Sequence, residues 1–417
     1  RRVYPQKRLF SHLLGYTGID NQGLAGIEHA HDQRLRKNDD RPLKLSLDVR
    51  LQHIMRRELE RSIKRFEARG GAGVIMNVNT GDVLSAVSLP DFDPHHPGSA
   101  ADDARFSRAT HGVYEMGSTF KIFSTAALLE KNAADMGTMF DASEPLQHGN
   151  YKIHDYHGKD RKLSLPEVFM YSSNIGAARI GEKVGGKFMQ QFYADLGLFT
   201  QPMIALPGVG RPLYPATWRE INTLTASYGH GVAVSPLQLT AAVASVVNGG
   251  LAVNPELIKS KRASDHDESA RVRVLSERTS QQMRRLMRLV VQKGTGNKAA
   301  VKGYQVGGKT GTAERAGKKG YEDAELMSSF VGVFPIDDPQ YAVFVMVHEP
   351  QGQEFSAGYA TGGWVAAPAV RRVISAMGPV LGMPARAEGA DDRMIAPLMR
   401  HVSLDTDASP GGAHAVE

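Results

Sequence analysis

Three short motifs in this 417-residue chain carry side chains that could perform nucleophilic catalysis. Ser118 and Lys121 stand three residues apart, and two companions follow downstream, Ser172 with Asn174 and then Lys309 in the run Lys-Thr-Gly-Thr. A serine hydroxyl becomes a strong nucleophile when a neighbouring base takes its proton. Lys121 would be that base, because residues three apart lie on one face of a helix. A serine activated by lysine indicates acyl transfer on a peptide or a lactam.

The proposed base sets physical conditions on its surroundings. A lysine accepts a proton only when it is neutral, so its pKa must fall from ~10.4 by about three units, or ~4 kcal/mol. Burial and a second cation both favour the neutral form, and Lys309 could supply that cation. Ser118 follows Gly117 and opens a predicted helix. Its backbone would then lie at a helix N-terminus, where unpaired N–H groups stabilise developing negative charge.

Each motif by itself also has an ordinary structural interpretation. Ser118 could be a helix N-cap, and Lys309 could be a surface lysine at the end of a strand. A Ser-x-x-Lys pair is expected about once by chance in a chain of this length. What favours a common site is the order of the three motifs and their predicted places on a helix start, a loop and a strand.

The elements that must position these residues indicate an α+β fold. Strand patterns lie near both ends of the domain, and a mainly helical block is inserted between them, which predicts an antiparallel sheet packed with helices. The predicted strands are 72–78, 83–87, 329–334 and 341–348, and the predicted helices are 51–66, 120–131, 165–184, 236–247, 280–291 and 365–377. Residues 1–44 are predicted to end an upstream domain, 45–384 to form the main domain, and 385–417 to be a disordered tail.

Composition excludes several classes of protein. The chain has no cysteine, so disulfides and thiolate metal sites are excluded. The net charge of +6 is concentrated in residues 1–70, which hold 16 Lys/Arg against 9 Asp/Glu. That excess suits a solvated helix face, or a surface near anionic lipid or a partner protein, better than a nucleic-acid interface. The chain begins at Arg1, and the longest apolar stretch is too short to span a bilayer, so we expect a fragment whose membrane anchor lies upstream.

The three motifs closely resemble those of the penicillin-binding and serine β-lactamase superfamily. More narrowly, the chain is similar to class B penicillin-binding proteins, which are monofunctional peptidoglycan D,D-transpeptidases. The resemblance implies the penicillin-binding transpeptidase fold, preceded by the end of an N-terminal pedestal domain. It extends beyond the motifs to residues 1–5, 23–28, 45–48, 79–82, 89–94, 227–238, 248–250 and 362–368. One departure is His230, which stands where glutamine is common.

The resemblance implies catalytic roles for five residues. Ser118 attacks the penultimate D-Ala carbonyl of a stem peptide, and Lys121 takes its proton. Ser172 relays a proton towards the leaving group, and Asn174 holds the substrate amide and contacts Lys121. Lys309 supports the charge in the site. A second stem peptide then resolves the acyl-enzyme, and β-lactams acylate the same serine because they mimic D-Ala-D-Ala.

The resemblance also implies a substrate-binding strand at residues 309–312. The hydroxyls of Thr310 and Thr312 bind the terminal carboxylate, with Gly311 between them. The backbone N–H groups of Ser118 and Thr312 form the oxyanion hole, a device that contributes ~3–4 kcal/mol per donor. The site needs no cofactor or metal. His154 and His157 could be read as metal ligands, but a polar loop is the simpler interpretation.

Within class B, the signatures favour the division-specific (septal) members. They imply a single-pass anchor upstream, a catalytic domain on the periplasmic face of the inner membrane, and a SEDS-type glycan polymerase and other division proteins as partners. Four alternatives stay open: an elongation-specific transpeptidase, a D,D-carboxypeptidase, a β-lactamase, and a non-catalytic scaffold that binds β-lactams.

Overall fold

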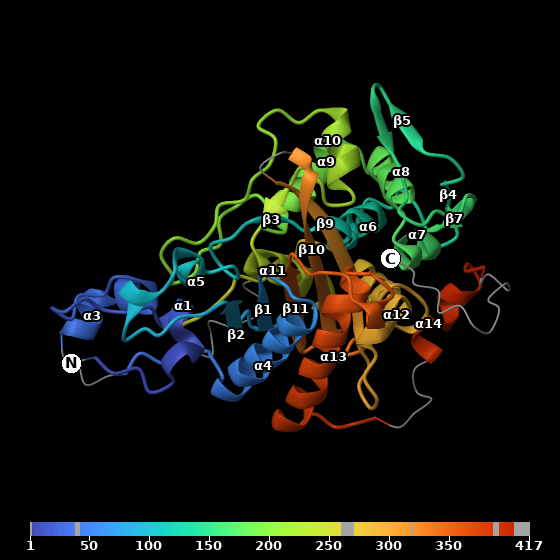
Figure 1. Cartoon of the computed structure of the whole chain (residues 1–417). Coiled ribbons are helices and arrows are strands. Elements are labelled where there is room, and N and C mark those ends of the chain that lie inside the picture. Colours follow the sequence, from blue (N-terminus) through green and yellow to red (C-terminus); the bar gives the residue numbers. More distant parts are fainter. Residues whose placement is uncertain (1, 38–41, 260–270, 318–319, 387–391, 404–417) are drawn as a thin grey trace.

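A five-stranded antiparallel sheet forms the centre of the molecule (Figure 1). The computed structural model describes residues 2–37, 42–259, 271–317, 320–386 and 392–403. The strand order is β2-β1-β11-β10-β9, so strands from the two ends of the domain are neighbours, as the α+β prediction requires. The strands are β1 (Gly70–Asn77), β2 (Val83–Leu89), β9 (Gly307–Gly317), β10 (Gly320–Phe334) and β11 (Tyr341–His348).

The middle strand, β11, shows why this segment forms a strand buried on both faces. Its sequence Tyr-Ala-Val-Phe-Val-Met-Val-His is almost continuously apolar, and the side chains alternate between two hydrophobic clusters. Val343 and Val345 join the cluster on one face, whereas Phe344 and Met346 join the cluster on the other. The period of two that defines a strand therefore connects both layers of the core.

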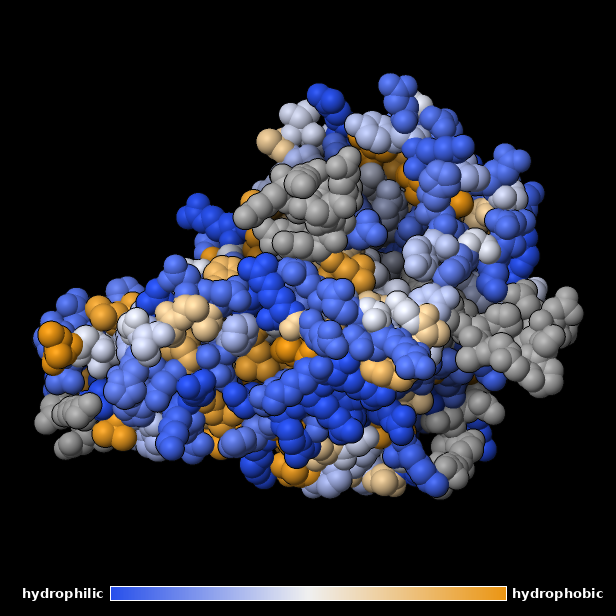
Figure 2. Space-filling model, in the orientation of Figure 1, coloured by the Kyte–Doolittle hydropathy of each residue, from blue (hydrophilic) through white to orange (hydrophobic). Residues whose placement is uncertain are grey.

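Two helices cover one face of the sheet, α4 (Val49–Arg65) and α13 (Gly362–Val380). Asp48 begins α4, because its carboxylate accepts hydrogen bonds from the backbone N–H groups of Arg50 and Leu51. Leu51 and Met55 are fully buried and share a cluster with Val370 of α13. The outer side of α4 is hydrophilic, in the lower middle of Figure 2.

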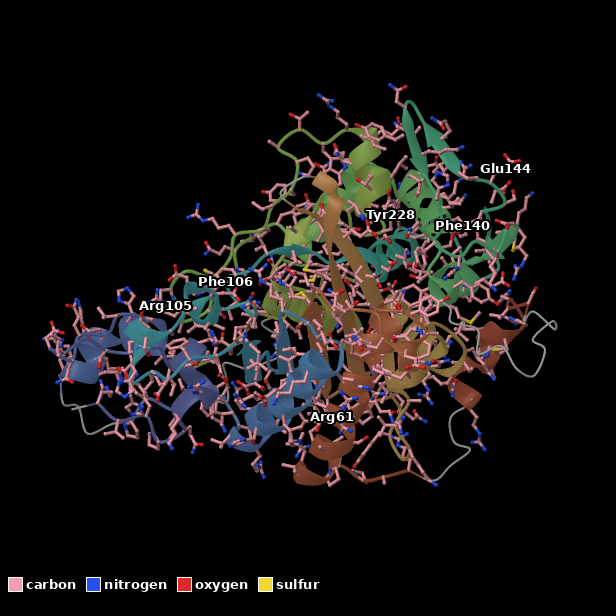
Figure 3. The ribbon with its side chains drawn as sticks, in the orientation of Figure 1. Arg61, Arg105, Phe106, Phe140, Glu144 and Tyr228 are labelled. Carbon is pink, nitrogen blue, oxygen red and sulfur yellow. The ribbon has the colours of Figure 1, made fainter. Side chains whose placement is uncertain are left out.

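A block of helices and short strands covers the other face. Helices α11 and α12 lie on the sheet, and α6 to α10 form the upper part of the molecule, where Figure 3 labels Phe140 and Tyr228. The elements of this block are β3 (Tyr114–Glu115), η3 (Gly117–Phe120), α6 (Lys121–Glu130), β4 (Met139–Asp141), β5 (Leu146–His148), β6 (Tyr151–Ile153), β7 (Lys162–Ser164), α7 (Leu165–Tyr171), α8 (Asn174–Val184), α9 (Gly186–Asp195), α10 (Glu220–Ala226), β8 (Ala233–Val234), α11 (Pro236–Val247) and α12 (Glu277–Lys293).

The sequence predicted one helix over residues 165–184, and this prediction is wrong. The structure breaks the segment into α7 and α8 at Ser172, which adopts the left-handed conformation with φ 62° and ψ 37°. Ser173 then caps α8, because its side chain accepts a hydrogen bond from the backbone N–H of Gly176. Serine competes with a helix by bonding to its own backbone, so the Ser-Ser-Asn sequence favours an end and a new start over a continuous helix.

The predicted disordered tail is also wrong for residues 392–403. Helix α14 (Asp392–Met399) packs beside α12, and Ile395 and Leu398 are each 2% exposed. The backbone N–H of Ser403 donates to Glu167 at 2.9 Å. The prediction was based on the small and charged residues that dominate the tail as a whole. It overlooked the apolar face of α14, formed by Ile395 and Leu398, through which the helix packs. Residues 387–391 and 404–417 lie outside the described part of the chain.

The N-terminal segment contains four short helices, of which η1 and α1 pack on α4 and β2 of the sheet domain. They are η1 (Lys7–Phe10), α1 (Ser11–Leu14), α2 (Gly26–Ala30) and α3 (Asp32–Arg36). Leu9 and Leu13 are buried in the main cluster, and Gln52 of α4 donates to the carbonyl of Leu9 at 2.9 Å. The domain boundary at residue 44 stays a prediction. Among the described residues, no helix is both long enough and apolar enough to cross a membrane.

Candidate active site

Ser118 lies in η3, the single turn that leads into α6, as the sequence predicted. Gly117 precedes it with φ +51°, and a Cβ at this glycine would lie 2.3 Å from the carbonyl oxygen of Thr312. Only glycine allows both this conformation and so close an approach of the two backbones. Gly117 therefore holds Ser118 against strand β9.

Lys121 is the first residue of α6, and its amine lies among oxygen atoms. Its Nζ is 2.9 Å from Ser118 Oγ, 3.1 Å from Ser172 Oγ and 2.8 Å from Asn174 Oδ1, and it also donates to the backbone carbonyl of Ser172. Lys121 is 1% exposed and Ser118 is 8% exposed. A proton can therefore pass directly between the serine hydroxyl and a neutral lysine, sheltered from bulk water.

Ser172 and Asn174 reach Lys121 because of the break between α7 and α8. The left-handed backbone at Ser172 directs both its hydroxyl and its carbonyl towards the lysine. Asn174 begins α8, with its side-chain oxygen on Lys121. The second motif thus contacts the first through the local structure that the helix prediction missed.

The third motif adds a second buried lysine to the site. Lys309 on β9 is 0% exposed, and its Nζ donates to Ser172 Oγ at 2.8 Å and to Thr310 Oγ1 at 3.3 Å. Thr310 is also 0% exposed, and its hydroxyl lies 2.8 Å from that of Thr295. This buried hydroxyl therefore contacts the Lys309 amine, and the contact between Thr310 and a substrate carboxylate stays a prediction.

Strand β9 presents its free edge to Ser118. It stands at the end of the strand order, and the carbonyl of Thr312 faces Gly117. In an antiparallel ladder the N–H and C=O of one residue point to the same edge, so the N–H of Thr312 also faces Ser118. Thr312 is partly exposed, and its hydroxyl accepts a hydrogen bond from the N–H of Gly362 at 3.1 Å. This geometry is compatible with the predicted oxyanion hole.

Further residues of the site were not found from the sequence. Burial lowers the pKa of His230, Lys121 adds to that lowering, and Glu115 opposes it. These surroundings therefore favour the neutral form of His230 near Lys121, the predicted base. Burial raises the pKa of Tyr228, whose ring is 5.1 Å from that of His230, to about 12. His230 lies within the family signature at residues 227–238, and its departure from the common glutamine was the one signal available for it.

Thr295 and Asp155 were missed for a different reason. Thr295 lies in a turn after α12, and Asp155 lies in the loop that also contains His154 and His157. Each acts on a catalytic segment that is distant in the sequence, so its own neighbours give no signal. Among the described residues, no three His, Asp or Glu side chains gather closely enough to hold a metal ion.

Comparison with known proteins identifies the family to which this geometry belongs. The model of the penicillin binding protein transpeptidase domain matches residues 71–375. The chain belongs to the penicillin-binding protein transpeptidase family. The family and the α+β fold predicted from the sequence are therefore confirmed.

Individual members of this family are similar over most of the chain. A probable peptidoglycan D,D-transpeptidase FtsI of Caulobacter vibrioides is 41% identical over 93% of this chain and 67% of that protein. Stage V sporulation protein D of Bacillus subtilis is 33% identical over 92% of this chain and 65% of that protein. Penicillin binding protein 3 of Mycobacterium tuberculosis, solved with aztreonam, superimposes with a TM-score of 0.81 at 26% identity, covering 93% of this chain and 92% of that one. The chain spans about two thirds of the length of the two curated relatives.

Proposed function

We propose that this penicillin-binding protein is a serine peptidoglycan D,D-transpeptidase that cross-links stem peptides during septal wall synthesis. The observation that carries the proposal is the position of Lys121 Nζ, 2.9 Å from Ser118 Oγ in a site closed by Ser172, Asn174 and Lys309. The names of the relatives support the reaction class, and the name FtsI of the Caulobacter relative supports the septal role.

The acylation step uses the first two motifs. Ser118 Oγ forms a bond to the penultimate D-Ala carbonyl carbon of a donor stem peptide while its proton passes to Lys121. The N–H groups of Ser118 and Thr312 stabilise the oxyanion. When the peptide bond breaks, the terminal D-Ala leaves as an amine that receives the proton through Ser172, which lies 3.1 Å from Lys121 Nζ. The product is an ester between the donor peptide and Ser118.

The second step transfers the acyl group to an acceptor. The amine of a second stem peptide attacks the ester, its proton returns to the Ser118 oxygen, and a new peptide bond forms the cross-link. Asn174 holds the substrate amide, and Lys309 places positive charge beside Ser172. The hydroxyls of Thr310 and Thr312 bind the terminal carboxylate, and the Thr310 hydroxyl also accepts a hydrogen bond from Lys309 at 3.3 Å.

The cellular setting follows from the same proposal. The catalytic domain works on the periplasmic face of the inner membrane, held by a single-pass anchor upstream of residue 1. Residues 1–44 are the end of a pedestal domain, and residues 45–384 are the transpeptidase domain. Its partners are a SEDS-type glycan polymerase and other division proteins.

The test is labelling with a fluorescent penicillin, followed by mass mapping of the acylated residue and measurement of the label's off-rate. We expect a long-lived adduct on Ser118 that is lost in Ser118→Ala and retained in Ser143→Ala, a variant of an exposed serine. Release of the label within minutes would instead indicate a β-lactamase. With a stem peptide as substrate and a second one as acceptor, hydrolysis without cross-linking would indicate a carboxypeptidase. Cross-link formation in cells by Ser118→Ala would exclude the enzymatic role.

A further inference from the structure

The loop between β6 and β7 carries a carboxylate that binds the start of α8. Asp155 Oδ1 accepts hydrogen bonds from the backbone N–H groups of Asn174 at 2.5 Å and of Ile175 at 2.9 Å. Its other oxygen, Oδ2, accepts from the hydroxyl of Ser173 at 2.7 Å. One side chain from another loop thus holds three consecutive residues, Ser173 and Asn174 in the second motif and Ile175 directly after it.

The same loop also holds the side chain of Asn174. The amide nitrogen of Asn174 donates to the carbonyl of His154 at 3.3 Å, which leaves its oxygen directed at Lys121 Nζ, 2.8 Å away. Ser173 is fixed twice, since its hydroxyl donates to Asp155 and accepts from the N–H of Gly176. The position of the catalytic asparagine relative to the base is therefore set by this loop.

The outer side of the loop reaches the β9 side of the site. His157 is exposed, and its ring lies 6.5 Å from that of Tyr359. Tyr359 in turn stacks on Trp364 at 6.1 Å, close to Gly362, whose N–H donates to Thr312. The loop therefore links the turn at Ser172 to the segment that supports the substrate-binding strand.

We propose that Asp155 is a positioning residue for acyl transfer. The proposal rests on the function proposed above. Asp155 acts through Asn174 and Ser172 and contacts neither substrate nor Ser118. By holding the first N–H groups of α8, it keeps the left-handed turn at Ser172 in the one arrangement that directs both catalytic side chains at Lys121. A small displacement of a catalytic group can slow a reaction on the order of 100-fold. The competing explanation is that Asp155 only caps a helix.

The two explanations predict different kinetics in the same variants. Stopped-flow acylation by a chromogenic cephalosporin separates the binding constant Kd from the acylation rate constant. We expect Asp155→Asn, which keeps the shape and removes the charge, to lower the rate constant by about 10-fold or more with Kd changed less than about threefold. Asp155→Ala should lower it further. Asp141→Asn is the matched control, since the Asp141 carboxylate accepts from the N–H and hydroxyl of Ser143 in an exposed turn.

The outcomes are distinguishable from failure of the proposed function. Wild-type chain that is never acylated at Ser118 would overturn that function, whatever the variants do. If wild type is acylated and both Asp155 variants react at the wild-type rate while their Tm falls, Asp155 only caps α8 and the positioning role is wrong. Asp155 variants that fail to fold where Asp141→Asn folds would lead to the same conclusion. A lower rate constant at a Tm equal to that of Asp141→Asn supports the proposal.

Discussion

Replacing Lys309 by methionine would remove one of two buried ammonium groups and keep a side chain of similar length. The Nζ atoms of Lys121 and Lys309 lie 3.1 and 2.8 Å from the same Ser172 Oγ. They are therefore no more than about 6 Å apart, where two unit charges repel by about 3 kcal/mol at an effective dielectric constant of about 20. That energy corresponds to about two pH units in a titration.

The direction in which the pH midpoint of acylation shifts depends on whether the repulsion favours the charged or the neutral form of a lysine. Two neighbouring cations favour loss of a proton from one of them, so Lys309 makes a neutral base available at lower pH. In Lys309→Met we expect the midpoint of the rate–pH profile for acylation to rise by about two units. The rate near neutral pH should fall by up to about 100-fold and recover in alkaline solution. The stability should change little or increase, because removing one buried charge from a like-charged pair relieves both repulsion and desolvation.

The assay is the acylation rate constant for a chromogenic cephalosporin at a series of pH values, with Tm measured at each. Lys131→Met is the control, since Lys131 follows α6 and donates to the carbonyl of Val184 at 2.8 Å, away from Ser118. A Lys309→Met profile with the wild-type midpoint and a uniformly lower rate would refute the repulsion argument. It would mean that Lys309 acts only by contacting the substrate or Ser172.

Two further predictions concern stability. Burial lowers the pKa of His12 to about 4, and Nε2 of the neutral ring donates to the carbonyl of Ala104. In the unfolded chain His12 binds a proton near pH 6.5. The contribution of neutral His12 to the free energy of unfolding is therefore complete above pH 6.5 and falls by about 3 kcal/mol as the pH drops to about 4. His12→Gln should therefore flatten the pH dependence of the urea midpoint in that window, and an unchanged slope would contradict the assignment. Leu398→Ala in α14 should lower the free energy of unfolding by about 2–4 kcal/mol, because Leu398 is buried. The control Leu213→Ala, at a residue 60% exposed, should lower it by under about 0.5 kcal/mol. Equal Tm values for the two variants would show that α14 does not dock on α12.

Segments with a clear period and clear ends were predicted well. Strand β11 and helix α11 have the predicted bounds. Each is an apolar run with turn residues at its ends, and each is buried along almost its whole length in the folded protein. The break at Ser172 was missed because the apolar residues of α7 and α8 continue in one helical pattern. Helix α14 was missed because its apolar face is short and lies within a small, charged tail.

The sequence by itself determined the chemistry of this protein. A serine, a lysine one turn later and a second lysine in a Lys-Thr-Gly-Thr run define acyl transfer by residue type and local spacing, and the surrounding signatures define the family. The side chains that meet at Lys121 were decided only by the tertiary structure. Ser172 is 51 residues from Lys121 and 137 from Lys309, so their contacts depend on how α7, α8 and β9 pack around the sheet. The same packing buries Thr310, leaves Thr312 partly exposed and brings Asp155 to the start of α8, because long-range contacts are properties of the folded chain and not of any local pattern.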